Sequence, residues 1–358
     1  MSLRFVEVID PLAKKHVSVT PSWQPSGSRI IYLDDPHHPL SVEHNEQRGS
    51  ADLALELWES DRLVVSGSGL LWCNNEILID PRFMAEYWRQ NLTGTKWSKP
   101  ERDVDLPIRT IGAPVISALG WAANEVYGHF ILEMLPRLIW ADDALRMEGT
   151  HAKVLLTKGF PSSQLDALKV AGFEENDFEF FDPEVERVFL ARGYFPTYAI
   201  RGRRNPAIAA SLERRFPNPR ELKRAGIAYV SRSKIGFDPL RRNCTNEDAL
   251  EKIAQEFGAE ITHPQFLPWS KQLELFHSRS IIVGLSGSGL HTSLLTGGSL
   301  CIGVVGHVNL AQARIAGVRG QRIGYQTKIR LSREYEVPLD GFRFLMDALI
   351  RAARQPVV

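Results

Sequence analysis

The chain has 358 residues, of which 44% are hydrophobic and 24% charged, and its formal net charge is +1. This balance excludes an intrinsically disordered chain and favours a globular protein of two domains. The near-neutral charge argues against a protein that attracts nucleic acid through its overall field. Three scattered cysteines without a CxxC pair argue against a zinc site or a disulfide scaffold.

Up to about residue 110 the sequence predicts a β-rich region. Short runs with β-branched residues stand between turn signals at 29–33, 62–66 and 76–79. From about residue 120 predicted helices and strands alternate: helix 124–140, strand 153–157, helix 162–171 and strand 187–191. Alternation of this kind favours a parallel sheet covered by helices.

A domain boundary is predicted at the proline-rich segment 217–220. After it, strands are predicted at 227–231, 259–262, 280–283 and 300–305, with helices at 246–257, 269–277 and 290–295 between them. This order is typical of a Rossmann-like half. We therefore expect an N-terminal domain over 1–218 (β-rich to about 110, then α/β), a C-terminal Rossmann-like domain over 219–340, and a closing helix within 341–358.

The segment 284–292, GLSGSGLHT, is a glycine-rich loop between a predicted buried strand and a predicted helix. Small residues let the backbone approach a ligand, and the N–H groups of a first helical turn point towards an anion. Open α/β sheets bind ligands at the carboxyl ends of their strands. The loop completes neither the GxGxxG fingerprint nor a P-loop. It therefore predicts an anion site, and the alternative is a tight turn without a ligand.

The segment 201–242 contains twelve basic and three acidic residues, a net charge of +9. Within it, Arg232 ends a predicted strand at the same edge as the glycine-rich loop. A guanidinium there would grip a diphosphate bidentately, and the alternative is a surface charge. Thr245 and Asp248 fit a capping box at the start of the next helix. This gives Asn246 and Glu247 a structural alternative to ligand binding.

His129 and Glu133 are four residues apart on a predicted helix, so they share one helical face. A carboxylate beside an imidazole orients the ring and raises its basicity, as a general base requires. The alternative is a buried histidine that is satisfied by hydrogen bonds.

Taken together and in this order, the three motifs resemble glycosyltransferase family 61, whose bacterial members are often described as capsular polysaccharide biosynthesis proteins. The resemblance covers roughly residues 120–306. Its first motif comprises Asn124, Tyr127, His129, Phe130, Glu133, Leu135, Pro136 and Arg137, its second Ser231, Arg232, Arg242, Asn246 and Glu247, and its third the loop from Gly284 to Thr292.

The third motif departs from the family pattern. Ser286 stands where the family loop usually has histidine, Leu285 stands where it has proline, and His291 and Thr292 replace a Thr-Asn pair. Ser286 can hydrogen-bond a phosphate, but it cannot carry a proton as histidine does. This departure motivates an alternative function, a nucleotide-sugar-binding protein that has lost catalysis.

The resemblance implies a GT-B-like fold, in which two Rossmann-like domains face each other across a cleft. It implies inverting hexosyl or pentosyl transfer from a nucleotide-sugar donor, with a UDP-sugar expected, to a glycan or lipid-linked glycan acceptor in capsule or exopolysaccharide biosynthesis. No cofactor and no metal ion are expected. An Asp-Val-Asp triplet at 103–105 is a candidate metal motif, but it lies outside the matched region.

The resemblance also implies roles for individual residues. His129 is expected to act as the catalytic base, oriented by Glu133, and Asn124 and Arg137 are expected on the acceptor side. The expected donor-binding residues are Arg232, Arg242, Asn246, Glu247, Ser286, Gly287, Ser288, Gly289 and Leu290.

Two further expectations concern the setting of the protein. The N-terminus has no apolar signal core, which predicts a cytoplasmic protein, and the basic segment would allow peripheral attachment to an anionic inner membrane. No nucleic-acid partner is expected. A less favoured alternative is a Rossmann-type NAD(P) oxidoreductase, against which the incomplete GxGxxG speaks.

Overall fold

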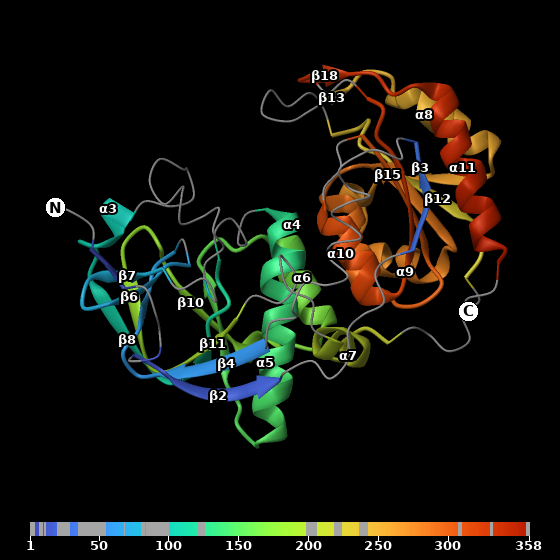
Figure 1. The fold of residues 1–358 in the computed structure, drawn as a ribbon. Coiled ribbons are helices and arrows are strands. Elements are labelled where there is room, and N and C mark those ends of the chain that lie inside the picture. The colour runs from blue at the N-terminus through green and yellow to red at the C-terminus, as the bar shows by residue number, and fades with distance from the viewer. Residues whose placement is uncertain are drawn as a thin grey trace. The chain divides into compact units, whose positions relative to one another are not determined.

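The computed structural model of the chain describes residues 4–6, 10, 12–19, 29–34, 55–67, 69–79, 83, 100–120, 126–197, 206–217, 224–235, 243–306, 310–329 and 332–355. The chain divides into two compact units (Figure 1). Unit 1 comprises 1–22 and 52–215, and unit 2 comprises 23–51 and 216–358. Each unit has a mixed α/β structure of its own.

The described part of unit 1 contains a ten-stranded sheet in the order β1-β7-β6-β5-β11-β8-β9-β10, with β4 paired to β11 and β2 paired to β4. Its strands are β1 (Arg4–Val6), β2 (Lys14–Val19), β4 (Leu55–Ser60), β5 (Val64–Val65), β6 (Leu71–Cys73), β7 (Glu76–Leu78), β8 (Ile108–Ile116), β9 (Lys153–Thr157), β10 (Phe178–Phe181) and β11 (Arg187–Pro196). Strands β11, β8, β9 and β10 are parallel neighbours, whereas β2, β4, β5 and β6 form antiparallel pairs. The sheet therefore combines the β-rich and the α/β regions that the sequence predicts.

The helices of unit 1 include a long helical segment next to the parallel strands. It consists of α4 (Tyr127–His129), a π-helix (Phe130–Met134) and α5 (Leu135–Met147), and Figure 1 shows α4 and α5 in line. The others are α3 (Pro100–Asp103), α6 (Ser162–Val170), a 3-10 turn (Glu175–Asp177) and α7 (Pro206–Arg215). The hydrophobic residues of the long segment are almost all buried, which makes it the central helix of this unit.

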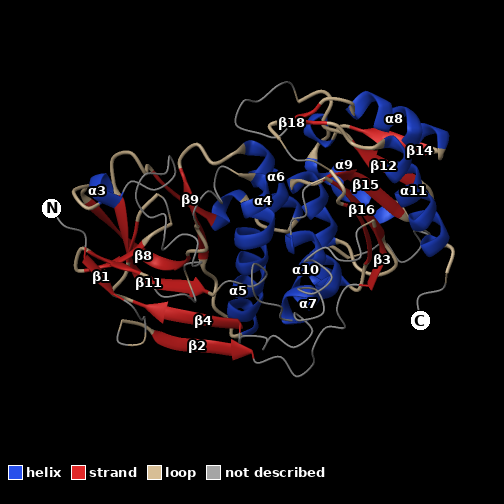
Figure 2. Cartoon of the chain, turned by 45° about the horizontal axis from the view of Figure 1, so that its top comes forward, coloured by secondary structure: helices blue, strands red, loops and turns tan. Residues whose placement is uncertain are grey.

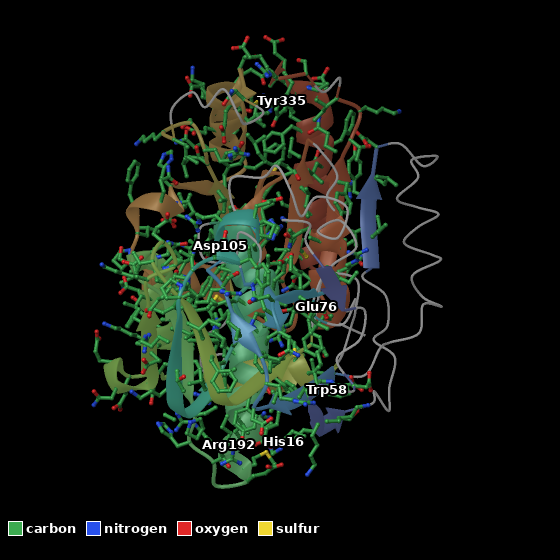
Figure 3. All side chains as sticks on the ribbon, turned by 90° about the vertical axis from the view of Figure 1, so that its left-hand side faces the viewer. His16, Trp58, Glu76, Asp105, Arg192 and Tyr335 are labelled. Atoms are coloured by element: carbon green, nitrogen blue, oxygen red, sulfur yellow. The ribbon has the colours of Figure 1, made fainter. Side chains whose placement is uncertain are left out.

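The antiparallel side of unit 1 is held by a cluster of charged and aromatic groups. His16 on β2 contacts two carboxylates, with its Nε2 2.8 Å from Glu148 and its Nδ1 3.4 Å from Glu59. Arg192 on β11 donates to Glu59 at 2.8 Å, and the His16 ring lies edge-on to Tyr194. Figure 3 labels His16 and Arg192 of this cluster. Because Glu148 directly follows α5, these contacts fasten β2 and β11 to the end of the central helix.

Unit 2 is built on a six-stranded parallel sheet in the order β14-β12-β15-β16-β17-β3 (Figure 2). Its strands are β12 (Ile227–Val230), β14 (Ala259–Thr262), β15 (Ile281–Leu285), β16 (Cys301–Val305), β17 (Arg322–Gln326) and β3 (Arg29–Leu33). The neighbours in this order pair in parallel. The short strands β13 (Asn243–Cys244) and β18 (Glu334–Tyr335) form a separate parallel pair.

Helices cover both faces of this sheet. On one face, α8 (Glu247–Glu256) and α11 (Leu339–Ala353) pack against the side chains of β15 and its neighbours. On the other, α9 (Trp269–Ser278), a 3-10 helix (Ser288–Leu295) and α10 (Leu310–Arg319) do so. Strands β15 and β16 are buried along their whole length, which explains their unbroken apolar sequences. Unit 2 is therefore a doubly wound, Rossmann-like domain.

The observed division of the chain differs from the predicted N-terminal domain over 1–218. Strand β3 pairs with β17, so this N-terminal segment completes the sheet of unit 2. Asp34, directly after β3, accepts hydrogen bonds from the backbone N–H groups of Thr327 and Lys328 at 2.8 and 2.9 Å. The strand propensity of residues 29–33 does not show which strand they pair with. The prediction therefore assigned this strand to the same domain as its neighbours along the chain.

The strand order creates a topological switch point between β12 and β15. From β12 the chain crosses through α8 to β14 at one side, and it then crosses back to β15 on the other side of β12. The loops that leave the carboxyl ends of β12 and β15 therefore diverge, and they leave a crevice between them in this class of sheet. Arg232 follows β12 and the glycine-rich loop follows β15.

Within the described residues, none of the helices combines the length and the apolarity that crossing a bilayer would need.

His277 on α9 is expected to make the stability of unit 2 depend on pH. Burial, and then the charges of Arg224 and Arg319, lower the pKa of His277 to about 4. The unfolded side chain has a pKa of about 6.5, so between pH 6.5 and 4 the unfolded chain takes up a proton that the folded unit excludes. The free energy of unfolding should therefore fall as the pH drops through this window, by about 2 kcal/mol at pH 5.

Urea unfolding of the wild type and of His277→Gln at pH 7 and pH 5 measures this contribution. The variant should lose less stability between the two pH values than the wild type. Equal losses in both proteins would show that His277 is protonated in the folded unit.

Candidate active site

His129 and Glu133 lie on the long helical segment of unit 1, where it widens into a π-turn. The Leu135 N–H donates to the carbonyl of Phe130, five residues earlier. Pro136 follows, and a proline has no N–H and would collide with the carbonyl four residues earlier in a regular α-helix. The wider turn accommodates this proline, and π-turns of this kind occur often at functional sites.

The imidazole of His129 and the carboxylate of Glu133 form a close pair. His129 Nδ1 is 3.1 Å from Glu133 Oε2, and the carboxylate side chain is 1% exposed whereas the imidazole is 19% exposed. With this partner, we assign the proton to Nδ1, which leaves Nε2 as a hydrogen-bond acceptor. The predicted pair is thus present, with a buried carboxylate beside a partly accessible imidazole.

Arg137 holds the same segment to the sheet. It is 2% exposed and donates hydrogen bonds to the carbonyls of Ala118 at 2.6 Å, Pro196 at 3.1 Å, Leu119 and Glu133. Its guanidinium therefore joins the helix to the chain at the carboxyl ends of β8 and β11. These contacts give Arg137 a structural role in addition to the acceptor-side role that the resemblance implies.

The anchoring by Arg137 brings the His129–Glu133 pair to the edge at which parallel strands end. Strands β8 and β11 run in the same direction, so their carboxyl ends meet at one edge of the sheet of unit 1. This is the edge at which open α/β sheets bind ligands. Asn124, the other residue expected on the acceptor side, lies outside the described residues.

At the switch point of unit 2, Arg232 and the glycine-rich loop are in contact. Arg232 Nη1 donates to the Ser286 carbonyl at 3.4 Å. A Cβ atom at Gly287 would lie 3.3 Å from the same Nη1, so a larger residue would crowd the guanidinium. At Gly284, a Cβ atom would lie 2.7 Å from the carbonyl oxygen of Val230, so this glycine lets β15 approach β12. The two predicted donor-binding elements are therefore brought together.

The loop uses some of its backbone N–H groups within the fold. The Ser286 N–H donates to Val305 at 2.8 Å, and the Leu290 N–H donates to Gly287 at 3.2 Å. The sequence predicts a helix at 290–295, and the structure has a 3-10 helix that begins earlier, at Ser288. The first N–H groups of a helix have no partner within it, which favours those of Ser288 and Gly289 as anion donors over that of Leu290.

Asn246 is occupied by a structural contact. Its side-chain amide donates to the Val337 carbonyl at 2.9 Å and accepts from the Val337 N–H at 3.0 Å. The predicted capping box of Thr245 and Asp248 is not the observed arrangement, because Asn246 is the N-cap and Thr245 bonds the Tyr335 carbonyl. This two-way hydrogen bond ties the start of α8 to the segment after β18.

Glu247 lies under Arg232. It is 6% exposed, and its Oε1 accepts the Arg232 backbone N–H at 2.8 Å and the Tyr229 hydroxyl at 3.4 Å. Burial raises the pKa of Glu247, against the opposing effects of Arg232 and its backbone hydrogen bond. The carboxylate therefore fixes the backbone from which the Arg232 side chain projects.

The described part of the basic segment is largely used for internal contacts. Arg214 and Arg215 form ion pairs with Asp143, each at 2.7 Å. Arg224 donates to three backbone carbonyls, and burial lowers its pKa. These arginines do not form a free basic surface, and Arg242 lies outside the described residues.

The Asp-Val-Asp triplet is also in a structural setting. Asp103 is 1% exposed at the end of α3 and pairs with Arg102 at 3.0 Å. Among the residues that the structure describes, no group of three or more His, Cys, Asp or Glu side chains is placed to hold a metal ion.

The structure adds residues at the carboxyl edge of unit 2 that the sequence did not single out. Ile235 lies in the turn after β12, and His263 and Phe266 lie in the turn after β14. A signal was present in the sequence HPQFLPW, which places an aromatic residue between two prolines directly after a predicted strand.

Fold and site together define an α/β protein with a doubly wound unit, a basic glycine-rich switch point, and an imidazole–carboxylate pair at the ends of the parallel strands of a second, mixed sheet. Residues 127–301 match the family model of Glycosyltransferase 61. This match confirms the resemblance to glycosyltransferase family 61 that the three motifs carry. A comparison with curated proteins found no match. The family implies glycosyltransferase activity, with a donor and an acceptor as substrates.

Proposed function

We propose that the chain is an inverting glycosyltransferase that moves a hexosyl or pentosyl group from a nucleotide-sugar, with a UDP-sugar as the expected donor, to a glycan or lipid-linked glycan. The observation that supports this is the position of the family motifs. Arg232 and the glycine-rich loop meet at the switch point of unit 2, and the His129–Glu133 pair stands at the ends of β8 and β11 in unit 1.

In the proposed donor site, unit 2 holds the nucleoside diphosphate. The Arg232 guanidinium and the N–H groups of Ser288 and Gly289 bind its phosphate oxygens, and Arg242 of the same family motif adds a second charge. Fixed positive charge stabilises the negative charge that develops on the leaving diphosphate, so these groups take the place of a metal ion.

In the proposed transfer step, His129 Nε2 takes the proton of an acceptor hydroxyl. The hydroxyl oxygen forms a bond to the anomeric carbon from the face opposite the diphosphate. The bond from that carbon to the diphosphate oxygen breaks, and the nucleoside diphosphate leaves with the electron pair, so the anomeric centre inverts. Glu133 stabilises the imidazolium that forms.

The transfer step requires the donor-binding groups of unit 2 and the His129–Glu133 pair of unit 1 to act on the same donor and acceptor molecules. A GT-B-like arrangement of the two units about a cleft is therefore part of the proposal. Capsule or exopolysaccharide biosynthesis in the cytoplasm is the setting that we propose from the family, with peripheral contact to the inner membrane where the acceptor is lipid-linked. Neither a cofactor nor a metal ion is required.

Arg232→Ala is expected to weaken binding of the donor nucleotide by about tenfold to a hundredfold, because it removes charge-assisted hydrogen bonds to the diphosphate. Arg232→Lys should recover part of this affinity, since it restores the charge without the planar fork. The exposed Arg351 on α11 supplies the matched control, Arg351→Ala. Titration calorimetry with UDP, GDP, CMP and ADP, without metal, measures the affinities.

Unchanged nucleotide affinity in Arg232→Ala would contradict the donor site. Ser286 favours a second candidate, a nucleotide-sugar-binding protein without catalysis. Product formation by the purified protein decides between the two, because only the transferase releases a glycosylated acceptor.

A further inference from the structure

We propose that the nucleobase of the donor binds at the carboxyl end of β14, on a surface made by Phe266, His263 and Ile235. This inference rests on the proposed function, because it places the rest of the donor molecule once Arg232 and the glycine-rich loop hold its diphosphate. It assigns base recognition to these three residues, and not to Asn246 and Glu247, which the resemblance places among the donor-binding residues.

The three residues lie on two adjoining turns. Strands β12 and β14 are parallel neighbours (Figure 2), and the Ser231 N–H donates to the Thr262 carbonyl at 2.8 Å, which joins the two strand ends. After β12, the Ile235 N–H closes a turn on the Arg232 carbonyl at 3.0 Å. After β14, His263 caps the 3-10 turn that ends at Phe266. Arg232, which binds the diphosphate in the proposed donor site, and the proposed base surface therefore lie at the ends of adjacent strands.

The surface is apolar and accessible. The Phe266 side chain is 65% exposed and that of Ile235 is 41% exposed. The rings of His263 and Phe266 have centroids 6.3 Å apart at an interplanar angle of 54°. Exposed aromatic faces next to cationic groups are the arrangement by which proteins stack nucleobases while they bind the phosphates.

His263 suits this role because its surroundings favour the uncharged form of its ring. Burial, and then the nearby charge of Lys234, lower the pKa of His263. Its buried Nδ1, like the buried Oγ1 of Thr262, has no hydrogen-bond partner among the described residues. A ligand or an ordered water bound at this strand end would satisfy these two polar atoms.

The topology gives the same assignment. Strand β14 is the second strand of the Rossmann-like series that begins at β12. In such folds a residue near the end of the second strand contacts the ribose of the nucleoside, and the first βα turn, which here carries Arg232, contacts the phosphates. Strands β14 and β15 are two strand spacings apart, about 10 Å. A diphosphate at Arg232 and the loop after β15 thus leaves the nucleoside to extend towards β14. Asn246 and Glu247 are already held by Val337, Arg232 and Tyr229.

The test compares Phe266→Ala with Phe344→Ala, each on the full chain. Phe344 is a matched control, because it is 62% exposed on the outer side of α11 in the same unit. Affinities are measured for UDP, GDP, CMP and ADP, and for inorganic pyrophosphate as a probe that has phosphates without a base. Phe266→Ala should weaken the tightest nucleotide by about tenfold and leave pyrophosphate unchanged, whereas Phe344→Ala should change neither.

Phe266→Trp should retain nucleotide affinity, since it keeps an aromatic face, and His263→Ala should reduce the preference among the four nucleotides. Wild-type nucleotide affinity in Phe266→Ala, with Arg232→Ala still defective, would overturn the base surface and leave the donor site standing. An equal loss for pyrophosphate and nucleotide would also overturn it, because the substitution would then act on the phosphates. No nucleotide binding by the wild type would overturn the proposed function together with this inference.

Discussion

His129→Ala is expected to lower the rate of sugar transfer by about a hundredfold to ten thousandfold and to leave the affinity for the donor nucleotide unchanged. The size follows from the loss of a positioned general base. The donor affinity should remain because the nucleotide is assigned to unit 2, whereas His129 is in unit 1. Release of the nucleoside diphosphate, with a donor and an acceptor that the wild type uses, gives the rate.

Two further variants and a rescue experiment make this result specific. Glu133→Gln keeps the shape and the Nδ1–H acceptor but removes the charge, so its loss should be smaller than that of His129→Ala. His151→Ala, which removes a histidine that is 59% exposed and paired with Asp177, should transfer sugar at the wild-type rate. Added imidazole should restore part of the activity of His129→Ala. A wild-type rate in His129→Ala would remove the histidine from the mechanism.

Arg137→Met is expected to lower the free energy of unfolding of unit 1 by about 3 kcal/mol. Methionine retains an apolar stem of similar length, but it leaves the carbonyls of Ala118 and Pro196 buried without their donor. Each orphaned carbonyl costs its desolvation free energy, and the helical segment also loses its link to β8 and β11. Urea unfolding followed by circular dichroism measures the change.

Arg214→Ala is the matched control for Arg137→Met. The Arg214 side chain is 57% exposed and pairs with Asp143 at the surface of the same unit, so its removal should cost less than about 1 kcal/mol. Equal losses of unfolding free energy in the two variants would show that the buried hydrogen bonds of Arg137 stabilise the unit no more than the exposed ion pair of Arg214 does. A folded Arg137→Met protein with reduced affinity for the acceptor alone would favour the acceptor-side role.

Much of the fold could be predicted from local sequence patterns. The strands at 153–157 and 259–262 agree with β9 and β14 residue for residue, because short β-branched runs bounded by turn signals leave little choice of boundary. The helix closed by Gly258 also appears as α8, within one residue at each end. The meeting of Arg232 with the glycine-rich loop follows from the rule that parallel strands end at one edge.

The remaining features depend on contacts between distant parts of the chain. The π-turn before Pro136 depends on the N–H that proline lacks and on the packing of the turns on either side. The hydrophobic periodicity of the sequence does not predict it. Asn246 has the sequence of a cap, yet its amide bonds Val337, about ninety residues away. The role of Phe266 depends on exposure, and a sequence pattern does not distinguish a buried aromatic residue from an exposed one.

The position of β3 has a consequence for the order in which the protein is made. The ribosome synthesises β3 almost 300 residues before β17, which is its only partner in the described sheet. Strand β3 therefore stays unpaired while unit 1 is synthesised. Closing so long a loop costs little more free energy than closing one of half the length, and the delay is therefore kinetic. A fragment that starts at Phe216 would carry β17 with an open edge, a template for aggregation. The two units are thus interleaved in synthesis, although each is compact once folded.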